Sequence, residues 1–176
     1  MRLFACASLV IATAAAAAVC APAGTARSSN PGDGCLVVAK GFGKITVTLT
    51  RGVVFGRFQS GTLKYNDQGL DPVLPRVPGT TPTKTSEHTW TYGPAEGARF
   101  RASGPTKLIV YAQFIDLSVA GKGTATISNA GLDAVPSVLN PPYNAYSVDG
   151  SSFCEDNFQK MPQTPAKVQI SSPIAG

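Results

Sequence analysis

Apolar and polar residues alternate along much of this chain. Between residues 44 and 50, Ile45, Val47 and Leu49 alternate with three threonines. Because successive side chains of a β-strand point to opposite faces, this alternation predicts a strand with one buried and one solvated face. Similar short stretches follow, separated by glycine and proline, and nowhere do apolar residues recur at helical spacing over three turns. The pattern predicts an all-β chain.

The alternating stretches also predict the fold class. We expect about nine or ten short strands, which suit a single-domain antiparallel β-sandwich or barrel. Where glycine or proline interrupts the pattern, we expect a turn or bulge at 51–52 and turns at 60–61 and 93–94. The predicted strands are 44–50, 53–59, 62–65, 88–92, 99–102, 108–119 (a bent pair), 124–128, 143–153 and 167–171.

The first 26 residues have the features of a secretory signal peptide. Arg2 is followed by an uncharged apolar run from 3 to 19, and small residues then permit cleavage after Ala23 or Ala26. The run is too short and too rich in alanine for a convincing permanent membrane span. We therefore expect a secreted protein, outside the cell or at the cell envelope, with no stable membrane span in the mature chain.

Two alternatives to this cleavage remain open. One is an uncleaved N-terminal anchor, and the other is lipid attachment at Cys20, although the bulky Val19 fits lipoprotein processing poorly. With cleavage, residues 27–34 form a polar, turn-rich lead-in and residues 35–176 form a single all-β domain. A domain of this size buries a substantial core, and we expect it to be monomeric.

The charge of the mature chain is modest. Of the 15 basic residues only Arg2 lies in the signal peptide, which leaves 14 against 10 acidic residues and a net charge of +4. Nucleic-acid binding proteins typically concentrate basic residues in a patch beside a recognisable motif, and here they are dispersed. We expect no nucleic-acid partner, and the charge favours solubility with weak attraction to anionic cell-wall or membrane surfaces.

Two cysteines, Cys35 and Cys154, remain after removal of the signal peptide. In an oxidising compartment such a pair is most simply a disulfide. It would close a loop of about 120 residues, for which the chain-entropy model predicts a stabilisation of about 4–5 kcal/mol. The alternative, a redox or metal-binding pair, lacks both CxxC spacing and a nearby histidine.

Two stretches resemble a known group of proteins. Residues 52–58 read Gly-Val-Val-Phe-Gly-Arg-Phe and are followed by Gly61-Thr62, and residues 115–123 read Ile-Asp-Leu-Ser-Val-Ala-Gly-Lys-Gly. Both stretches resemble segments of uncharacterised secreted all-β proteins of high-GC bacteria. The resemblance implies secretion and β structure, and it implies no activity.

These regions also echo each other at an offset of 62 residues. Only the Gly-Thr pair is identical, so chance similarity between strands is the alternative explanation. If the echo is real, it predicts two similar hairpin units packed face to face. The matched positions are Val47, Leu49, Val53, Phe55, Gly61 and Thr62 with Ile109, Tyr111, Ile115, Leu117, Gly123 and Thr124.

His88 is the one histidine of the chain. Gly-x-Ser-x-Gly, Ser-x-x-Lys and His-Glu-x-x-His motifs do not occur in the sequence, and a lone histidine cannot complete a zinc site. We therefore assign no catalytic residue, no metal site and no cofactor. On a strand, His88, Trp90 and Tyr92 would share one face, and they form our candidate ligand-binding site, since such rings suit sugar stacking or partner binding. The alternative, which we favour, is a core strand with Trp90 buried under the opposite sheet.

Asp116 lies inside an apolar run, between Ile115 and Leu117. A buried charge is costly unless it is paired, and Arg57, in the matching part of the earlier unit, is the partner we expect. Arg57 and Asp116 are therefore a candidate buried charge pair. The alternative is a bulge that turns Asp116 toward solvent, which we favour over a functional acid.

These patterns favour a non-catalytic β-domain that binds an unknown extracellular or cell-wall ligand. One alternative is a secreted hydrolase that uses Asp116 and a second carboxylate from a loop, since glycoside hydrolysis needs two carboxylates that flank one bond. The other alternative is a structural surface protein.

Overall fold

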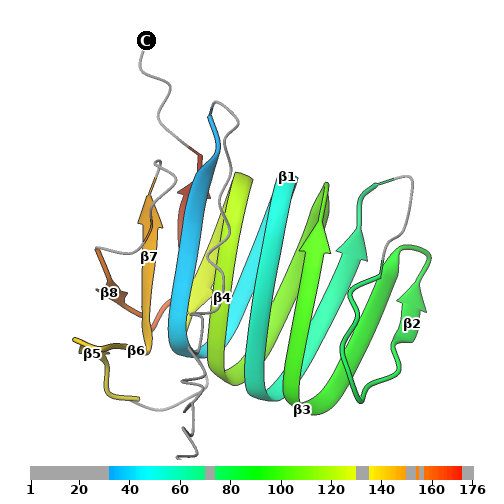
Figure 1. Ribbon diagram of the computed structural model, residues 1–176, viewed down its shortest axis with the longest axis horizontal. Helices are drawn as coiled ribbons and strands as arrows, with labels where there is room; N and C mark the ends of the chain where they lie inside the picture. Colours follow the sequence, from blue (N-terminus) through cyan, green and yellow to red (C-terminus); the bar gives the residue numbers. More distant parts are fainter. Residues whose placement is uncertain (1–31, 70–73, 130–134, 150–153, 155–156, 172–176) are drawn as a thin grey trace, which may run out of the picture.

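The computed structural model describes residues 32–69, 74–129, 135–149, 154 and 157–171 (Figure 1). Every regular element among them is a β-strand, and neighbouring strands pair antiparallel. The predicted all-β antiparallel fold is therefore confirmed. The sheet has free edges at β2 and β9 and is not closed on itself, which corresponds to the sandwich and not to the barrel.

Three of the strands are far longer than expected. β1 has 34 residues, β3 has 15 and β4 has 23. The turns predicted at 51–52, 60–61 and 93–94 are bends inside β1 and β3, because Gly52, Gly61 and Gly93 adopt positive φ angles and let the chain bend without leaving the ladder. The strands are β1 (Gly34–Asp67), β2 (Thr83–Ser86), β3 (Thr89–Ser103), β4 (Thr106–Ser128), β5 (Val138–Leu139), β6 (Pro142–Tyr143), β7 (Ala145–Asp149), β8 (Gln159–Lys160) and β9 (Ala166–Ile170).

β1 and β4 bend so strongly that each contributes to two layers, and Figure 1 shows them winding as a flattened coil. Residues 44–49 of β1 lie between two segments of β4, since Lys44 pairs with both Tyr111 and Ser128. Residues 53–58 instead lie between β3 and a third segment of β4. The first layer contains, in spatial order, β7, 35–39, 115–121, 53–58 and 98–103. The second layer contains β9, 123–128, 44–49, 106–112, 60–67, 89–95 and β2.

The hydrophobic core lies between these two layers. In the predicted strand at 44–50, Ile45, Val47 and Leu49 are at most 1% exposed while Thr46 and Thr48 face outward, as their alternation predicts. Burial of one such side chain contributes about 1.5–3 kcal/mol relative to exposure, so one continuous core stabilises both layers. The first layer supplies Leu36, Val38, Val54, Phe58, Phe100, Ile115, Leu117 and Val119 to the same cluster.

The two regions matched at an offset of 62 residues follow the same path between the two layers. Each runs from the second layer to the first and back, with bends at Gly52 and Gly61 in β1 and at Phe114 and Gly121 in β4. The units are interleaved, because strands of one pair on both sides with strands of the other. The expectation of two hairpin units packed face to face is therefore wrong, although the repeated winding exists.

A disulfide joins Cys35, at the start of β1, to Cys154, beyond β7, with Cα atoms 5.9 Å apart. Both residues are buried. This bond confirms the predicted pairing, and disulfides are typical of extracellular proteins. The predicted signal peptide and residues 27–31 of the lead-in lie outside the described residues. Within the described ranges, no helix is long and apolar enough to span a membrane.

Candidate functional site

The predicted row of His88, Trp90 and Tyr92 does not form a common surface. Tyr92 is 1% exposed and Trp90 packs partly buried against the core, because both face inward beside Leu63 and Tyr65 of β1. His88 lies in the turn before β3, outside the strand's alternation, with 58% of its side chain exposed. The favoured alternative, a core strand, thus describes Trp90 and Tyr92, and the three rings offer no shared binding face.

Arg57 and Asp116 form an ion pair on the outer surface of the first layer. The Nε of Arg57 donates to Oδ2 of Asp116 at 2.8 Å, and Nη2 of Arg57 lies 2.7 Å from the same oxygen. The side chains are 52% and 30% exposed, so the pair is not buried, and the expectation of a buried pair is wrong. The reason is the alternation of the run, in which Ile115 and Leu117 point into the core and turn Asp116 outward.

Near this ion pair, residues other than glycine adopt positive φ angles, which such residues rarely do. Lys40, Phe114 and Asn144 have φ angles of 44°, 52° and 48°, and they are the non-glycine residues with positive φ in the described part of the chain. Such a conformation costs roughly 1–2 kcal/mol for most side chains. Lys40 is held by two hydrogen bonds: its N–H donates to Oδ1 of Asp116 at 2.9 Å, and its carbonyl accepts from the N–H of Asn144 at 3.2 Å.

An aromatic cluster supports the bend at Phe114. The ring of Phe114 lies 4.7 Å from that of Phe42 and 6.1 Å from that of Tyr143, measured between ring centroids. Phe42 is 7% exposed, whereas Phe114 is 36% exposed. Phe114 therefore presents a fixed, partly solvated ring at the surface.

These groups line an open pocket of about 330 Å³. Its charged residues are Lys40, Arg57, Arg99 and Asp116, and Phe114 forms part of its wall. We call this group of five residues the basic corner. Small-molecule sites begin at about this volume, so the pocket accommodates one unit of the size of a sugar ring.

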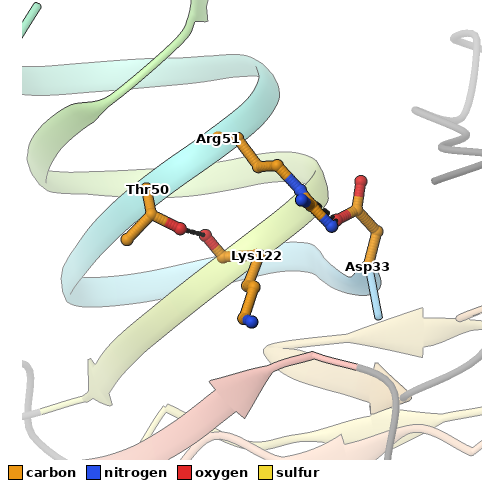
Figure 2. Close-up of polar contacts among 4 residues, drawn as sticks. All are labelled: Asp33, Thr50, Arg51 and Lys122. Atoms are coloured by element: carbon orange, nitrogen blue, oxygen red, sulfur yellow. Dashed lines mark hydrogen bonds and ion pairs between the residues drawn. The ribbon is translucent and has the colours of Figure 1, made fainter. Parts of the chain in front are cut away.

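A second Arg–Asp pair lies at the opposite end of the same strand segment (Figure 2). Arg51 Nε and Nη2 both lie 2.8 Å from Oδ1 of Asp33, and the side chain of Asp33 is 2% exposed. Beside it, Thr50 donates to the carbonyl of Lys122 at 3.0 Å. Arg51 precedes the bend at Gly52, and Arg57 follows it in the first layer.

The chain bends at this end through glycines. Gly52 and Gly121 pair with each other, and both have positive φ. A Cβ at Gly52 would lie 2.3 Å from the carbonyl oxygen of Ala120, so the two backbones approach too closely for any side chain. We call Asp33, Arg51, Gly52 and Gly121 the glycine corner.

Comparison with protein-family models, with curated proteins and with solved structures found no match. In the residues that the structure describes, no group of three or more His, Cys, Asp and Glu side chains could hold a metal ion.

Sequence reasoning found Arg57 and Asp116 but missed Lys40, Arg99 and Phe114. These residues meet through pairing between distant parts of the chain, since Arg57 lies opposite both Arg99 and Asp116 in the ladder. One weak signal was present: Arg99 occupies an outward position in the Arg-Phe-Arg run of 99–101.

Proposed function

We propose that this protein is a non-catalytic binding module that acts outside the cell or at the cell envelope. The basic corner carries the proposal, because it gathers three cationic side chains and an exposed ring around one open pocket. The disulfide and the signal peptide expected from the sequence support an extracellular site of action.

The role of Asp116 also supports binding. Its two oxygens accept hydrogen bonds from Arg57 and from the backbone of Lys40. An acid that performs glycoside hydrolysis acts together with a second carboxylate, and among the residues that line this pocket Asp116 is the single carboxylate. We infer that Asp116 positions its neighbours and does not itself react.

The test is retention of the purified, oxidised protein on immobilised polysaccharides. We expect saturable binding to at least one of three probes: polygalacturonate, phosphorylated dextran and unmodified dextran. Gln59 lines the pocket and is exposed, so Gln59→Trp should fill the pocket and abolish retention. The matched control is Gln169→Trp, an exposed position on β9 in the second layer, which should bind normally.

Three results would overturn the proposal. The first is retention on none of the probes, and the second is retention that Gln59→Trp leaves intact. The third is release of reducing sugar from a probe that stops in Asp116→Asn, which would make the protein a hydrolase.

A further inference from the structure

The charges of the basic corner do not balance. Three cationic side chains face one carboxylate, and Asp116 already accepts from Arg57 and from the backbone N–H of Lys40. In the described ranges of the chain, the guanidinium of Arg99 and the ammonium of Lys40 form no salt bridge. The pocket therefore holds two positive charges more than its own residues neutralise.

The two arginines are placed against each other. Arg57 and Arg99 are direct partners in the antiparallel ladder of β1 and β3, and both are exposed on the outer surface of the first layer. Directly opposite side chains have Cβ atoms about 4.5–5.5 Å apart, and like charges at this distance destabilise the sheet. An anion bound between them would remove this repulsion, so the pocket favours an anionic ligand.

The ion pair with Asp116 holds the side chain of Arg57 in position for such a ligand. A guanidinium has five N–H donors, and the contacts to Oδ2 of Asp116 engage Nε and Nη2. The remaining donors of Arg57 are available to a carboxylate or a phosphate, whose oxygens match the planar fork. Because the ion pair fixes the side chain beforehand, binding loses less conformational entropy.

The other lining groups suit a sugar ring. Phe114 is 36% exposed and rests against the ring of Phe42, which gives the pocket a rigid apolar wall. Aromatic walls of this kind stack against the apolar face of a sugar. Gln59 adds an amide that can donate to and accept from hydroxyl groups.

We infer that the basic corner binds an acidic sugar unit, with its oxyanion between Arg57 and Arg99 and its ring against Phe114. The oxyanion is a carboxylate, as in a uronic acid, or a phosphate ester. This inference rests on the proposed binding function and names the ligand class of the same pocket.

The test uses three ligands that share one ring: galacturonate, galactose 6-phosphate and galactose. Isothermal titration calorimetry on the oxidised protein should show binding of one or both acidic sugars at least about tenfold tighter than galactose. The preferred acid distinguishes a uronic acid from a sugar phosphate. Acetate and inorganic phosphate, which lack the ring, should bind more weakly than the acidic sugars.

The decisive variant is Arg99→Gln, which we expect to weaken binding of the acidic sugar about 10- to 100-fold. Its matched control is Arg101→Gln, because Arg101 lies on the same strand and faces the same side, but its guanidinium lies 5.2 Å from the ring of Phe55 and outside the pocket. Arg101→Gln should change the affinity less than about twofold. Thermal unfolding of Arg99→Gln should occur at the wild-type temperature or slightly above it, since a like-charge contact is removed.

Three results would overturn the inference, and they are distinct from failure of the binding module. Equal weakening by both arginine variants would indicate general attraction of anions. If galactose bound as tightly as the acidic sugars and Gln59→Trp abolished this binding, the protein would still be a binding module. The inferred anion site would then be wrong. Binding of a single-stranded DNA oligonucleotide as tight as that of the acidic sugar would indicate a nucleic-acid site.

Discussion

The two corners of the sandwich turn the same chain in different ways. At the glycine corner, Gly52 and Gly121 pass so close together that no side chain fits, and a buried Asp33 is paired with Arg51. At the basic corner, Lys40 and Phe114 take up the bend, although glycine would do so at lower cost.

This difference supports the proposal that the basic corner is the binding site. A glycine bend offers no side chain to a ligand, and the glycine corner is organised for close packing. The basic corner keeps a cation and an aromatic ring at its bends and places both in an open pocket. Strained conformations that persist with side chains attached cluster at binding sites, since the side chains are needed there.

The largest effect is expected from the disulfide, which lies beside the glycine corner because Cys35 pairs with Ala120. Replacing both Cys35 and Cys154 by serine should lower the free energy of unfolding by about 4 kcal/mol, because the unfolded chain gains the entropy of a long open loop. Denaturant unfolding of the oxidised protein and of the double variant measures this. A loss below about 1 kcal/mol would show that the unfolded chain is already constrained.

The next largest loss of stability is expected at Gly52, and Gly97 beside the pocket provides the comparison. Gly52→Ala should lower the free energy of unfolding by about 3 kcal/mol, because its Cβ would meet backbone and its φ is positive. Gly97, which lines the pocket, also has positive φ but nothing within 4 Å of an added Cβ. Gly97→Ala should therefore cost about 1 kcal/mol, from backbone strain alone. Equal losses in thermal or denaturant unfolding would contradict the distinction between the corners.

A smaller effect compares the two Arg–Asp pairs. Asp33→Asn leaves Arg51 facing a neutral group at a buried position and should cost about 2 kcal/mol. Asp116→Asn breaks an exposed pair, and its Oδ1 can still accept from Lys40, so the loss should be about 0.5 kcal/mol. Raising the salt concentration should weaken the contribution of Asp116 more than that of Asp33. The reverse order of losses would argue against the burial assigned to Asp33.

The smallest effect on stability at neutral pH is expected from Tyr92, a core residue beside the bend at Gly93 of β3. The hydroxyl of Tyr92 is buried and has no hydrogen-bond partner in the described residues, so Tyr92→Phe should change stability by less than about 0.5 kcal/mol at pH 7. A loss above about 1 kcal/mol would reveal a polar partner of the hydroxyl.

At alkaline pH, ionisation of Tyr92 should lower the stability of the folded protein. Burial, with a smaller contribution from the charge of Tyr65, raises the pKa of Tyr92 to about 12. Between pH 10 and 12 the unfolded chain releases a proton that the folded protein retains, so stability falls as pH rises, by at most about 1.4 kcal/mol per pH unit. Tyr92→Phe should reduce this slope, and an unchanged slope would show that other groups cause it.

The predictions from sequence succeeded where a local pattern or the number of candidate partners was sufficient. Alternation identified the strand at 44–50, and the two remaining cysteines identified the disulfide. The row at 88–92 failed because His88 belongs to a turn, and because alternation defines a shared face without saying whether that face is core or surface.

The basic corner depended on information that no single stretch contains. Arg57 meets Arg99 and Asp116 through the register of three strands, and register is set by the whole fold. The positive φ angles of Lys40 and Phe114 are likewise imposed by their surroundings, since neither residue type favours them. A sequence can suggest that Asp116 needs a partner, but it cannot place both groups on an outer surface.

The interleaving of β1 and β4 has a consequence for how the protein folds. In the described structure β1 pairs with β3, β4 and β7, and all of these come later in the chain. β1 therefore cannot form its sheet pairings by itself and must wait until residues beyond 89 are present. Sheets built from such distant pairings fold slowly, on a timescale of about milliseconds to seconds. During synthesis, residues 34–67 must remain unpaired until these partner segments are present.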